Sequence, residues 1–416
     1  MSEQAAIDSF LNETGAMVAS YLEACVHCGL CAEACHFHEM SGNPRHAPIY
    51  KLKPLYKAYR RHKAPFAGLR RMLGVAPPEV TQAELEEWQE LLYDTCTVCG
   101  RCTLICPMGI DIASLVALCR RGMVDAGLAP PSLMAVAERS LKEGSPLGVT
   151  PKVFKERIAW LSDEYDVKIP LDKKQADVLV TASSIETMKY PESLAAMAKI
   201  FNHAGENWTY HTHGYEATNF GMLTGSREVT KAMVTRLVET AESIGARLVV
   251  LPECGHAYGA LRWNGADIIG RSLPFEVLHI TEYLAKLKRE GRLKLTPLKQ
   301  SITFHDPCQI ARRGGATNAP RDVLNGFATD FREMKNAGNT NWCCGGGGGV
   351  STIARADALR HKVFEIKMRQ VDDTGAEAMV SSCANCRQTF DDDKAHYQWD
   401  RKIESLVEIV AGHLAD

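Results

Sequence analysis

Two cysteine-rich runs with identical spacing constrain this chain more than any other feature of its sequence. Both follow the pattern C-x2-C-x2-C-x3-C, and Pro107 comes directly after the second. In this pattern three close thiolates ligate one cubane [4Fe–4S] cluster, while the fourth cysteine ligates the other cluster. We therefore assign one cluster to Cys25, Cys28, Cys31 and Cys106, and the other to Cys96, Cys99, Cys102 and Cys35.

A pair of zinc sites is the alternative to two iron–sulfur clusters. Zinc ribbons use C-x2-C pairs that a long loop separates, whereas here four cysteines fall within eleven residues, twice. The spacing therefore favours iron–sulfur. One departure from the usual pattern is His36, which stands where a proline normally follows the fourth cysteine. This change removes no ligand.

The composition indicates a cytoplasmic protein whose thiols stay reduced. The 416 residues include 15 cysteines, which in a reducing compartment suggest metal ligands more than disulfides. The N-terminus lacks the basic-then-apolar order of a signal peptide, and no stretch approaches 18 consecutive apolar residues. A net charge of −2 gives no reason to expect a nucleic-acid partner.

A basic insertion separates the two cysteine runs. Residues 41–78 contain no acidic residue, and apolar residues such as Ile49, Leu52 and Tyr56 recur at near-helical spacing. The nine basic residues of the insertion are Arg45, Lys51, Lys53, Lys57, Arg60, Arg61, Lys63, Arg70 and Arg71. They form either a solvated basic face or a docking element for anionic headgroups or a membrane-embedded partner. The second reading predicts peripheral attachment to the inner face of the cell membrane.

The pattern of hydrophobic residues predicts an α+β protein. Helices are expected over 82–93 and over 112–161, with breaks at Pro130–Pro131 and Pro146. From residue 175 buried strands at 176–181, 247–251, 301–305 and 376–381 alternate with helices, which indicates parallel sheets. We expect a helical ferredoxin domain over 1–165, followed by two α/β units over 175–295 and 298–416.

The two α/β units look like copies of one another, of which only the second keeps its cysteines. Cys308 to Cys343 spans 35 positions, as does Ser183 to Thr218 in the first copy. Cys343 to Cys383 spans 40 positions, against 36 from Thr218 to Cys254, so Cys383 corresponds to Cys254 less closely. The first copy is therefore expected to be degenerate. The sequence leaves open whether Cys254 or His256 has a role.

The complete copy should bring five thiols together. Cys308, Cys343, Cys344, Cys383 and Cys386 follow strand ends, and the carboxyl ends of parallel strands meet in one crevice. Five ligands exceed what tetrahedral zinc takes, and the adjacent pair suggests an unusual cluster.

Two further features flank this crevice. Gly345, Gly346 and Gly347 would let the backbone pass close to the cluster and point amide donors at its sulfurs. His305 and Asp306 could orient the cluster ligands or donate a proton. The alternative is that each is an ordinary structural residue.

At these residues the chain resembles a known family. The pattern Cys-x34-Cys-Cys-Gly-x37-Cys-x2-Cys is similar to the "CCG" cysteine-rich domain of heterodisulfide reductases. A chain with this domain and a two-cluster ferredoxin segment resembles the D-type subunit of these enzymes. Residues 216–221 and 253–257 resemble the DsrK-type branch of the family, which has relatives in the Tmc and Hmc complexes. Unlike the D-type subunit, this chain has lost the cysteines of one CCG site.

The resemblance implies one noncubane [4Fe–4S] cluster on the five cysteines, where a disulfide- or polysulfide-type substrate is reduced or formed. It also implies a membrane cytochrome b-type partner that exchanges electrons with quinone. A small cysteine-bearing sulfur carrier or a thiol/disulfide compound would be the substrate, with His305 as a candidate proton donor. The alternative is a subunit that only wires electrons for a flavoprotein dehydrogenase of the glycolate, lactate or glycerol-3-phosphate type.

Overall fold

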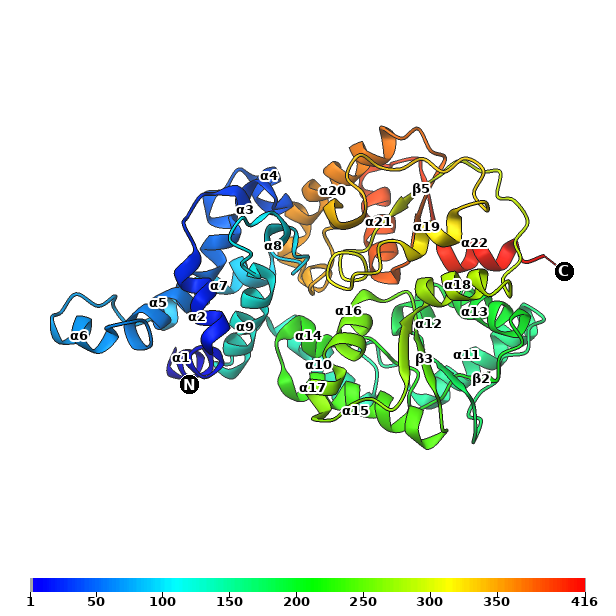
Figure 1. The fold of residues 1–416 in the computed structure, drawn as a ribbon, viewed down its shortest axis with the longest axis horizontal. Coiled ribbons are helices and arrows are strands. Elements are labelled where there is room, and N and C mark those ends of the chain that lie inside the picture. The colour runs from blue at the N-terminus through cyan, green and yellow to red at the C-terminus, as the bar shows by residue number, and fades with distance from the viewer. Residues whose placement is uncertain (1–2, 416) are drawn as a thin grey trace. The chain divides into compact units, whose positions relative to one another are not determined.

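The computed structural model describes residues 3–415. The chain folds into two compact units, each built from several separate segments of the sequence (Figure 1). The first unit comprises Met1–Ala135, Gly221–Arg227 and Gly345–Ile366. The second comprises Val136–Phe220, Glu228–Cys344 and Lys367–Asp416. The helical segment from residue 136 to 165, expected in the ferredoxin domain, thus groups with the α/β part of the chain. The three-domain division stays a prediction.

The first unit is helical. Its longer helices are α1 (Glu3–Glu13), α2 (Ala16–Ala24), α5 (Lys53–His62), α7 (Gln82–Tyr93) and α9 (Ile112–Asp125). Helix α1 packs on α9 and α5. In the core of this unit, Phe10 of α1 and Trp88 of α7 are buried in edge-to-face contact. Helix α7 begins at a capping box, in which Thr81 and Glu84 exchange side-chain and main-chain hydrogen bonds. The predicted helix at 82–93 is confirmed.

The two cysteine runs have the same backbone conformation. In each, the residue before the second cysteine is left-handed, His27 with φ 53° and Val98 with φ 54°. A glycine follows the second cysteine, Gly29 with φ 84° and Gly100 with φ 75°, and it begins a short helix, α3 (Leu30–Glu33) or α8 (Arg101–Ile105). Only glycine adopts this conformation without strain, which explains its place in both runs.

The second unit contains two parallel sheets. The first has the order β2-β1-β3-β4, formed by Trp208–Thr209, Val178–Val180, Leu248–Leu251 and Glu276–His279. The second has the order β5-β6-β7, formed by Ile302–His305, Ala378–Ser381 and Lys402–Ser405. All pairs are parallel, as the fold-class prediction required.

The two sheets share one hydrophobic core and repeat one local motif. Leu194, Phe201 and Tyr283 belong to the same buried cluster as Phe304 and Val407. After β1, β3 and β6 a short loop leads into α12 (Ser184–Lys189), α16 (Gly255–Tyr258) and α21 (Ala384–Tyr397).

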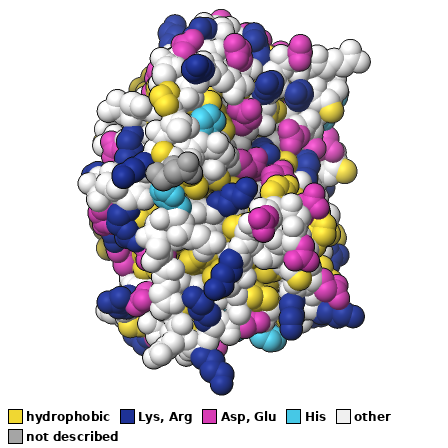
Figure 2. Space-filling view, turned by 90° about the vertical axis from the view of Figure 1, so that its right-hand side faces the viewer, with side chains coloured by type: hydrophobic (Ala, Val, Ile, Leu, Met, Phe, Trp, Pro, Cys, Tyr) yellow, Lys and Arg dark blue, Asp and Glu magenta, His cyan; other side chains and the backbone are white. Residues whose placement is uncertain are grey.

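Surface charge is mixed on the face drawn in Figure 2, where acidic and basic side chains are interspersed and apolar ones are scattered.

Candidate functional site

Two cavities of the first unit are lined by the two predicted sets of cubane ligands. Cys25, Cys28, Cys31 and Cys106 line a cavity of about 310 Å³. A smaller cavity is lined by the other four, Cys35, Cys96, Cys99 and Cys102. In both, the fourth cysteine of one run joins three from the other run, as cross-ligation requires. The donor sets therefore fit two cubanes, although the ligand assignment itself stays a proposal.

In the second cavity, burial and mutual repulsion disfavour free thiolates, so a positive charge such as that of bound iron would be needed to stabilise them. Burial, followed by repulsion from Cys99, Cys96 and Cys35, raises the pKa of Cys102 well above its ordinary value. Burial also raises the pKa of Cys35, and the charge of Lys51 opposes that rise. Lys51 is only 1% exposed and donates to the main-chain oxygen of Thr95. A buried cation thus faces the second set of cysteines.

Arg120 ties the second cysteine run to the rest of the first unit. Its guanidinium is fully buried and donates to the main-chain oxygens of Leu92, Cys96, Leu223 and Gly348, at 2.7 to 2.8 Å for the closest bond to each. One side chain therefore satisfies four carbonyls from segments far apart in the sequence. The sequence did not reveal this role because an arginine in an amphipathic helix looks like a solvated residue.

The five-cysteine site forms in the second unit. All five thiols are buried, with exposures of 2% to 6%. The sulfurs of Cys308 and Cys343 lie 3.7 Å apart. Hydrogen bonds with Cys344 and Cys383, in that order of effect, raise the pKa of Cys386 well above its ordinary value. The structure therefore brings together all five residues that the strand-end argument joined.

The start of helix α21 stabilises one of these thiolates. Cys383 caps the helix, and a hydrogen bond from Cys386 is the largest of the effects that lower its pKa. Main-chain amides of Cys386, Gly255 and Asn385 lower it further. Within residues 3–415 no three Cys, His, Asp or Glu side chains are placed to hold a single metal ion. Five buried thiols exceed the four ligands that tetrahedral zinc takes, so the donor set fits a thiolate-ligated cluster better than a lone zinc ion.

The degenerate copy closes one side of the five-cysteine site. The main-chain oxygen of Glu253 accepts from the amide of Ala384 at 2.7 Å, and a Cβ on Gly255 would meet Gln309 at 2.6 Å. Burial, and then the neighbouring Cys383, raises the pKa of Cys254 to about 12. Cys254 therefore lies beside the complete site as a protonated thiol.

Within residues 175–295, the predicted degenerate copy, hydroxyls and carboxyls stand where the second copy would have thiols. Ser183 donates to Glu186 at 2.7 Å, and the amides of Ser184 and Thr218 donate to Glu216 at 2.9 and 2.7 Å. Burial raises the pKa of Glu186 and of Glu216 to about 7. Such a polar network, short of soft ligands, does not suit a second iron–sulfur cluster.

His305 is a buried residue whose suggested role as a proton donor stays a prediction. Its ring is fully buried against Phe390, and neither ring nitrogen has a hydrogen-bond partner among the described residues. Burial, with smaller effects from Lys367 and Arg312, holds the pKa of His305 well below 6.5. The imidazole is therefore neutral at neutral pH and has no imidazolium proton to give.

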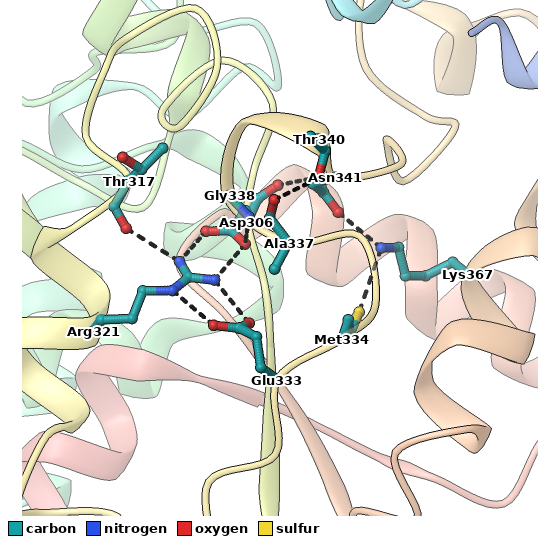
Figure 3. Close-up of polar contacts among 10 residues, drawn as sticks. All are labelled: Asp306, Thr317, Arg321, Glu333, Met334, Ala337, Gly338, Thr340, Asn341 and Lys367. Atoms are coloured by element: carbon teal, nitrogen blue, oxygen red, sulfur yellow. Dashed lines mark hydrogen bonds and ion pairs between the residues drawn. The ribbon is translucent and has the colours of Figure 1, made fainter.

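Asp306 is a structural residue whose charge is fully compensated. Figure 3 shows its carboxylate held by both terminal nitrogens of Arg321, which also binds Glu333. The amide of Gly338 donates to Asp306 at 2.7 Å. The loop from 333 to 341 is fixed in this way, and with it the approach to Cys343.

Lys367 is a second buried cation that the sequence did not reveal. It lies on α20 (Asp357–Asp372) with 1% exposure. Its ammonium donates to Asn341 at 2.9 Å and to Gln370 at 2.8 Å, and contacts the sulfur of Met334 at 3.6 Å (Figure 3). Because one lysine in a helix normally lies in solvent, only the fold could identify it.

The glycine run has a packing role in addition to the one expected. Gly348 has φ +63°, and a Cβ there would meet the backbone of Thr97 at 2.8 Å. A Cβ on Gly345 would meet Val363 at 3.3 Å. The segment that directly follows Cys343-Cys344 therefore packs on the second cysteine run within the first unit. The proposed contact of Gly345, Gly346 and Gly347 with a cluster stays a prediction.

Ion pairs compensate much of the basic insertion. The acids come from elsewhere in the first unit, and the pairs are Arg45–Glu87, Lys57–Glu84, Arg60–Glu23 and Arg61–Glu79. The insertion is therefore less cationic than its own sequence suggests. The insertion also exposes large apolar side chains around α6 (Ala67–Met72). The exposed fractions are 48% to 76% for Phe66, Leu69, Met72, Leu73 and Val75.

Comparison with known proteins supports the iron–sulfur reading. A family described as "4Fe-4S dicluster domain" matches residues 21–110, and one described as "Cysteine-rich domain" matches residues 302–391. The chain is 29% identical to the D-type subunit of the dihydromethanophenazine:CoB–CoM heterodisulfide reductase of Methanosarcina barkeri, covering 94% of this chain and 93% of that protein. The expected resemblance to the D-type subunit is confirmed.

Two other relatives have names that mention quinones. The "Hdr-like menaquinol oxidoreductase iron-sulfur subunit 2" of Archaeoglobus fulgidus is 26% identical over 84% of this chain and 70% of its own length. The "EtfAB:quinone oxidoreductase" of Syntrophomonas wolfei is 28% identical over 88% of this chain and 54% of its own length. These relatives support an iron–sulfur electron-transfer subunit of an oxidoreductase. No helix in residues 3–415 has the length and hydropathy to cross a bilayer.

Proposed function

We propose that this iron–sulfur subunit serves a quinone-linked membrane complex and reduces or forms a disulfide-type bond at its five-cysteine site. Two cubane [4Fe–4S] clusters would be held by the two cross-ligated sets of four cysteines. One noncubane [4Fe–4S] cluster would be held by Cys308, Cys343, Cys344, Cys383 and Cys386. When bound, such clusters take up and release electrons.

The convergence of the five buried thiols carries this proposal. A wiring role needs no more than cubanes, whereas this crevice gathers five soft ligands beside a protonated sixth thiol, Cys254. Burial excludes water from the thiols, and the amides around Cys383 favour its thiolate. The chain's own residues thus prepare one dry, sulfur-rich site at strand ends, where α/β folds place their ligands.

Single Cys→Ser variants test this function. Cys343→Ser or Cys386→Ser should abolish reoxidation of the dithionite-reduced protein by a disulfide, while both cubanes remain reducible. Cys254→Ser is the matched control, because Cys254 is buried at the same crevice but is not a proposed ligand. Disulfide-dependent reoxidation that survives in both ligand variants would reject the catalytic role.

The wiring subunit remains the second candidate. The relative named "EtfAB:quinone oxidoreductase" favours it, since its name couples EtfAB to a quinone without mentioning a disulfide. Copurification separates the two readings. A small cysteine-bearing carrier protein or a disulfide substrate would indicate the first function, and a flavoprotein dehydrogenase the second.

A membrane cytochrome b-type protein is the partner we propose for the electron path. Peripheral attachment at the inner face of the cell membrane would use the tip formed by residues 66–75, called here the α6 tip. Five exposed apolar side chains lie there beside Arg70 and Arg71, and no acidic residue occurs between positions 41 and 78. In Figure 1, α6 lies beyond α5 at one end of the first unit. This composition suits an anionic lipid interface.

A further inference from the structure

Two lysines of this chain are buried, and each faces a set of cysteines. Within residues 3–415 only Lys51 and Lys367 are buried among the lysines, each with 1% exposure. Lys51 acts on Cys35 and Cys102. Lys367 faces Cys343, Cys344 and Cys386, and each of these thiols, like Asp306, favours its charged form. Burying an ammonium is costly, so its repeated placement beside thiols calls for a compensating negative charge.

The hydrogen-bond partners of Lys367 do not supply that negative charge. Asn341, Gln370 and Met334 are all neutral. Asp306, which also favours the charged form of Lys367, is paired through both carboxylate oxygens with Arg321. The three thiols act on Lys367 in the same direction, and Lys367 in turn lowers the pKa of His305. The neutral acceptors hold the ammonium in place while leaving its charge to act on the cysteines.

The degenerate copy provides an internal comparison. It keeps only Cys254 of the corresponding thiols, and helix α15 (Arg227–Ser243), which follows Thr218 as α20 follows Cys343, has no buried base. The basic residues of α15, Arg227, Lys231 and Arg236, are all exposed or half-buried. The buried charged groups of that copy are carboxyls instead. The buried cation thus occurs where the thiols are retained and is missing where only one of them is kept.

We propose that Lys367 is the fixed positive charge of the five-cysteine centre and raises the reduction potential of the cluster bound there. This inference rests on the proposed function, because it needs a cluster on those thiols. The step concerned would be a one-electron reduction, for which a reduced cubane held by this chain would supply the electron, and no bond would form or break. Lys367 would act through its charge and not by touching the substrate. A nearby cation stabilises the reduced state of a cluster, because that state carries more negative charge.

The ammonium should remain charged in the loaded protein. Burial lowers the pKa of Lys367 to about 8, which the neighbouring Asp306 and thiols partly oppose. A thiolate-ligated cluster adds negative charge at the same place, so Lys367 is expected to be protonated at neutral pH.

The test is an EPR-monitored redox titration of the full chain carrying its clusters. In Lys367→Met the potential of the five-cysteine centre should become more negative, while the two cubanes keep theirs. Lys367→Arg should retain most of the original potential, because it keeps the charge. Lys362→Met is the matched control, since Lys362 is exposed on the same helix. Lys367→Gln, which keeps a donor but not the charge, replaces the Met variant if the latter fails to assemble.

The outcomes separate this inference from the function on which it rests. An unchanged potential in the loaded Lys367→Met and Lys367→Gln proteins would overturn the role of Lys367 and leave the cluster assignment intact. A shift of equal size in Lys367→Arg would also overturn it, because packing rather than charge would then be responsible. A wild-type protein without a third cluster signal would reject the proposed function itself, and the role of Lys367 with it.

Discussion

At the scale of single residues, buried charges organise both kinds of site. Arg120 and Lys367 are each surrounded by neutral acceptors, and neither is paired with a carboxylate in its hydrogen bonds. The cysteines could be assigned from spacing alone, because three close thiols leave one corner of a cubane open. The buried cations could not, since a lone Lys or Arg in a helix has the same pattern whether it faces solvent or a site.

Replacing Arg120 should be strongly destabilising. Arg120→Met leaves four buried carbonyls without their donor, and each unsatisfied group costs about 1–3 kcal/mol. We expect a loss of about 3–5 kcal/mol in the free energy of unfolding, in the range for breaking buried charged networks. Denaturant unfolding of the full chain measures it. The neighbouring Arg121→Met is the control, because Arg121 makes a partly exposed ion pair with Glu13 and should lose no more than about 1 kcal/mol. Equal losses in both variants would contradict this role of Arg120.

At the scale of secondary structure, the sequence located the central elements and missed the edges. Strands β1, β3, β5 and β6 and helix α7 lie where the hydrophobic pattern placed them. Strand β2 has only two residues, while β7 has an exposed or half-buried pattern with Lys402 and Glu404. Neither strand has enough apolar residues to show the two-residue alternation by which a strand is recognised in a sequence. These edge strands are set by pairing with β1 and β6, which the sequence alone does not show.

The degenerate copy should make stability depend on pH. The pKa of Glu216 rises from 4.5 to about 7 because the carboxyl is buried. The native state thus holds this proton more tightly than the unfolded chain. The contribution is fully present below about pH 4.5 and is lost as the pH rises through 7, by about 3 kcal/mol. Melting temperatures measured from pH 5 to 8 should fall with pH.

Glu216→Gln isolates that contribution. Both carboxyl oxygens accept main-chain amides, so the amide of glutamine lowers stability at every pH. The measured quantity is therefore the slope of stability against pH, which should become flatter. The exposed Glu239→Gln is the control and should leave the slope unchanged. An unaltered slope in Glu216→Gln would show that this carboxyl ionises freely in the native state.

The α6 tip should govern membrane binding more than the paired bases of the insertion. Replacing Leu69 and Met72 with glutamate introduces charge into the exposed apolar surface and should reduce binding to vesicles of anionic lipid at least tenfold. Vesicle cosedimentation measures the effect. Lys57→Gln is the control, because Lys57 is already paired with Glu84 at 2.7 Å. Unchanged binding of the double variant would show that the α6 tip does not contact lipid.

At the scale of the whole molecule, the segments of the two units alternate along the chain. Within the first unit, the glycine segment packs on Thr97, next to Cys96. Cysteine spacing and strand ends are local signals, so the sequence could indicate which cysteines lie together; the cluster assignments and the duplication stay predictions. The interleaving of segments 221–227 and 345–366 with the ferredoxin helices depends on tertiary packing and could not be anticipated.

Iron content with EPR, measured on the anaerobically reconstituted full chain, tests the central claim most directly. The account predicts about twelve irons per chain and three cluster signals, from two cubanes and one noncubane cluster. In Cys343→Ser the count should fall to about eight, with both cubane signals retained. A wild-type protein with about eight irons, and no change in Cys343→Ser, would contradict a cluster at the five-cysteine site.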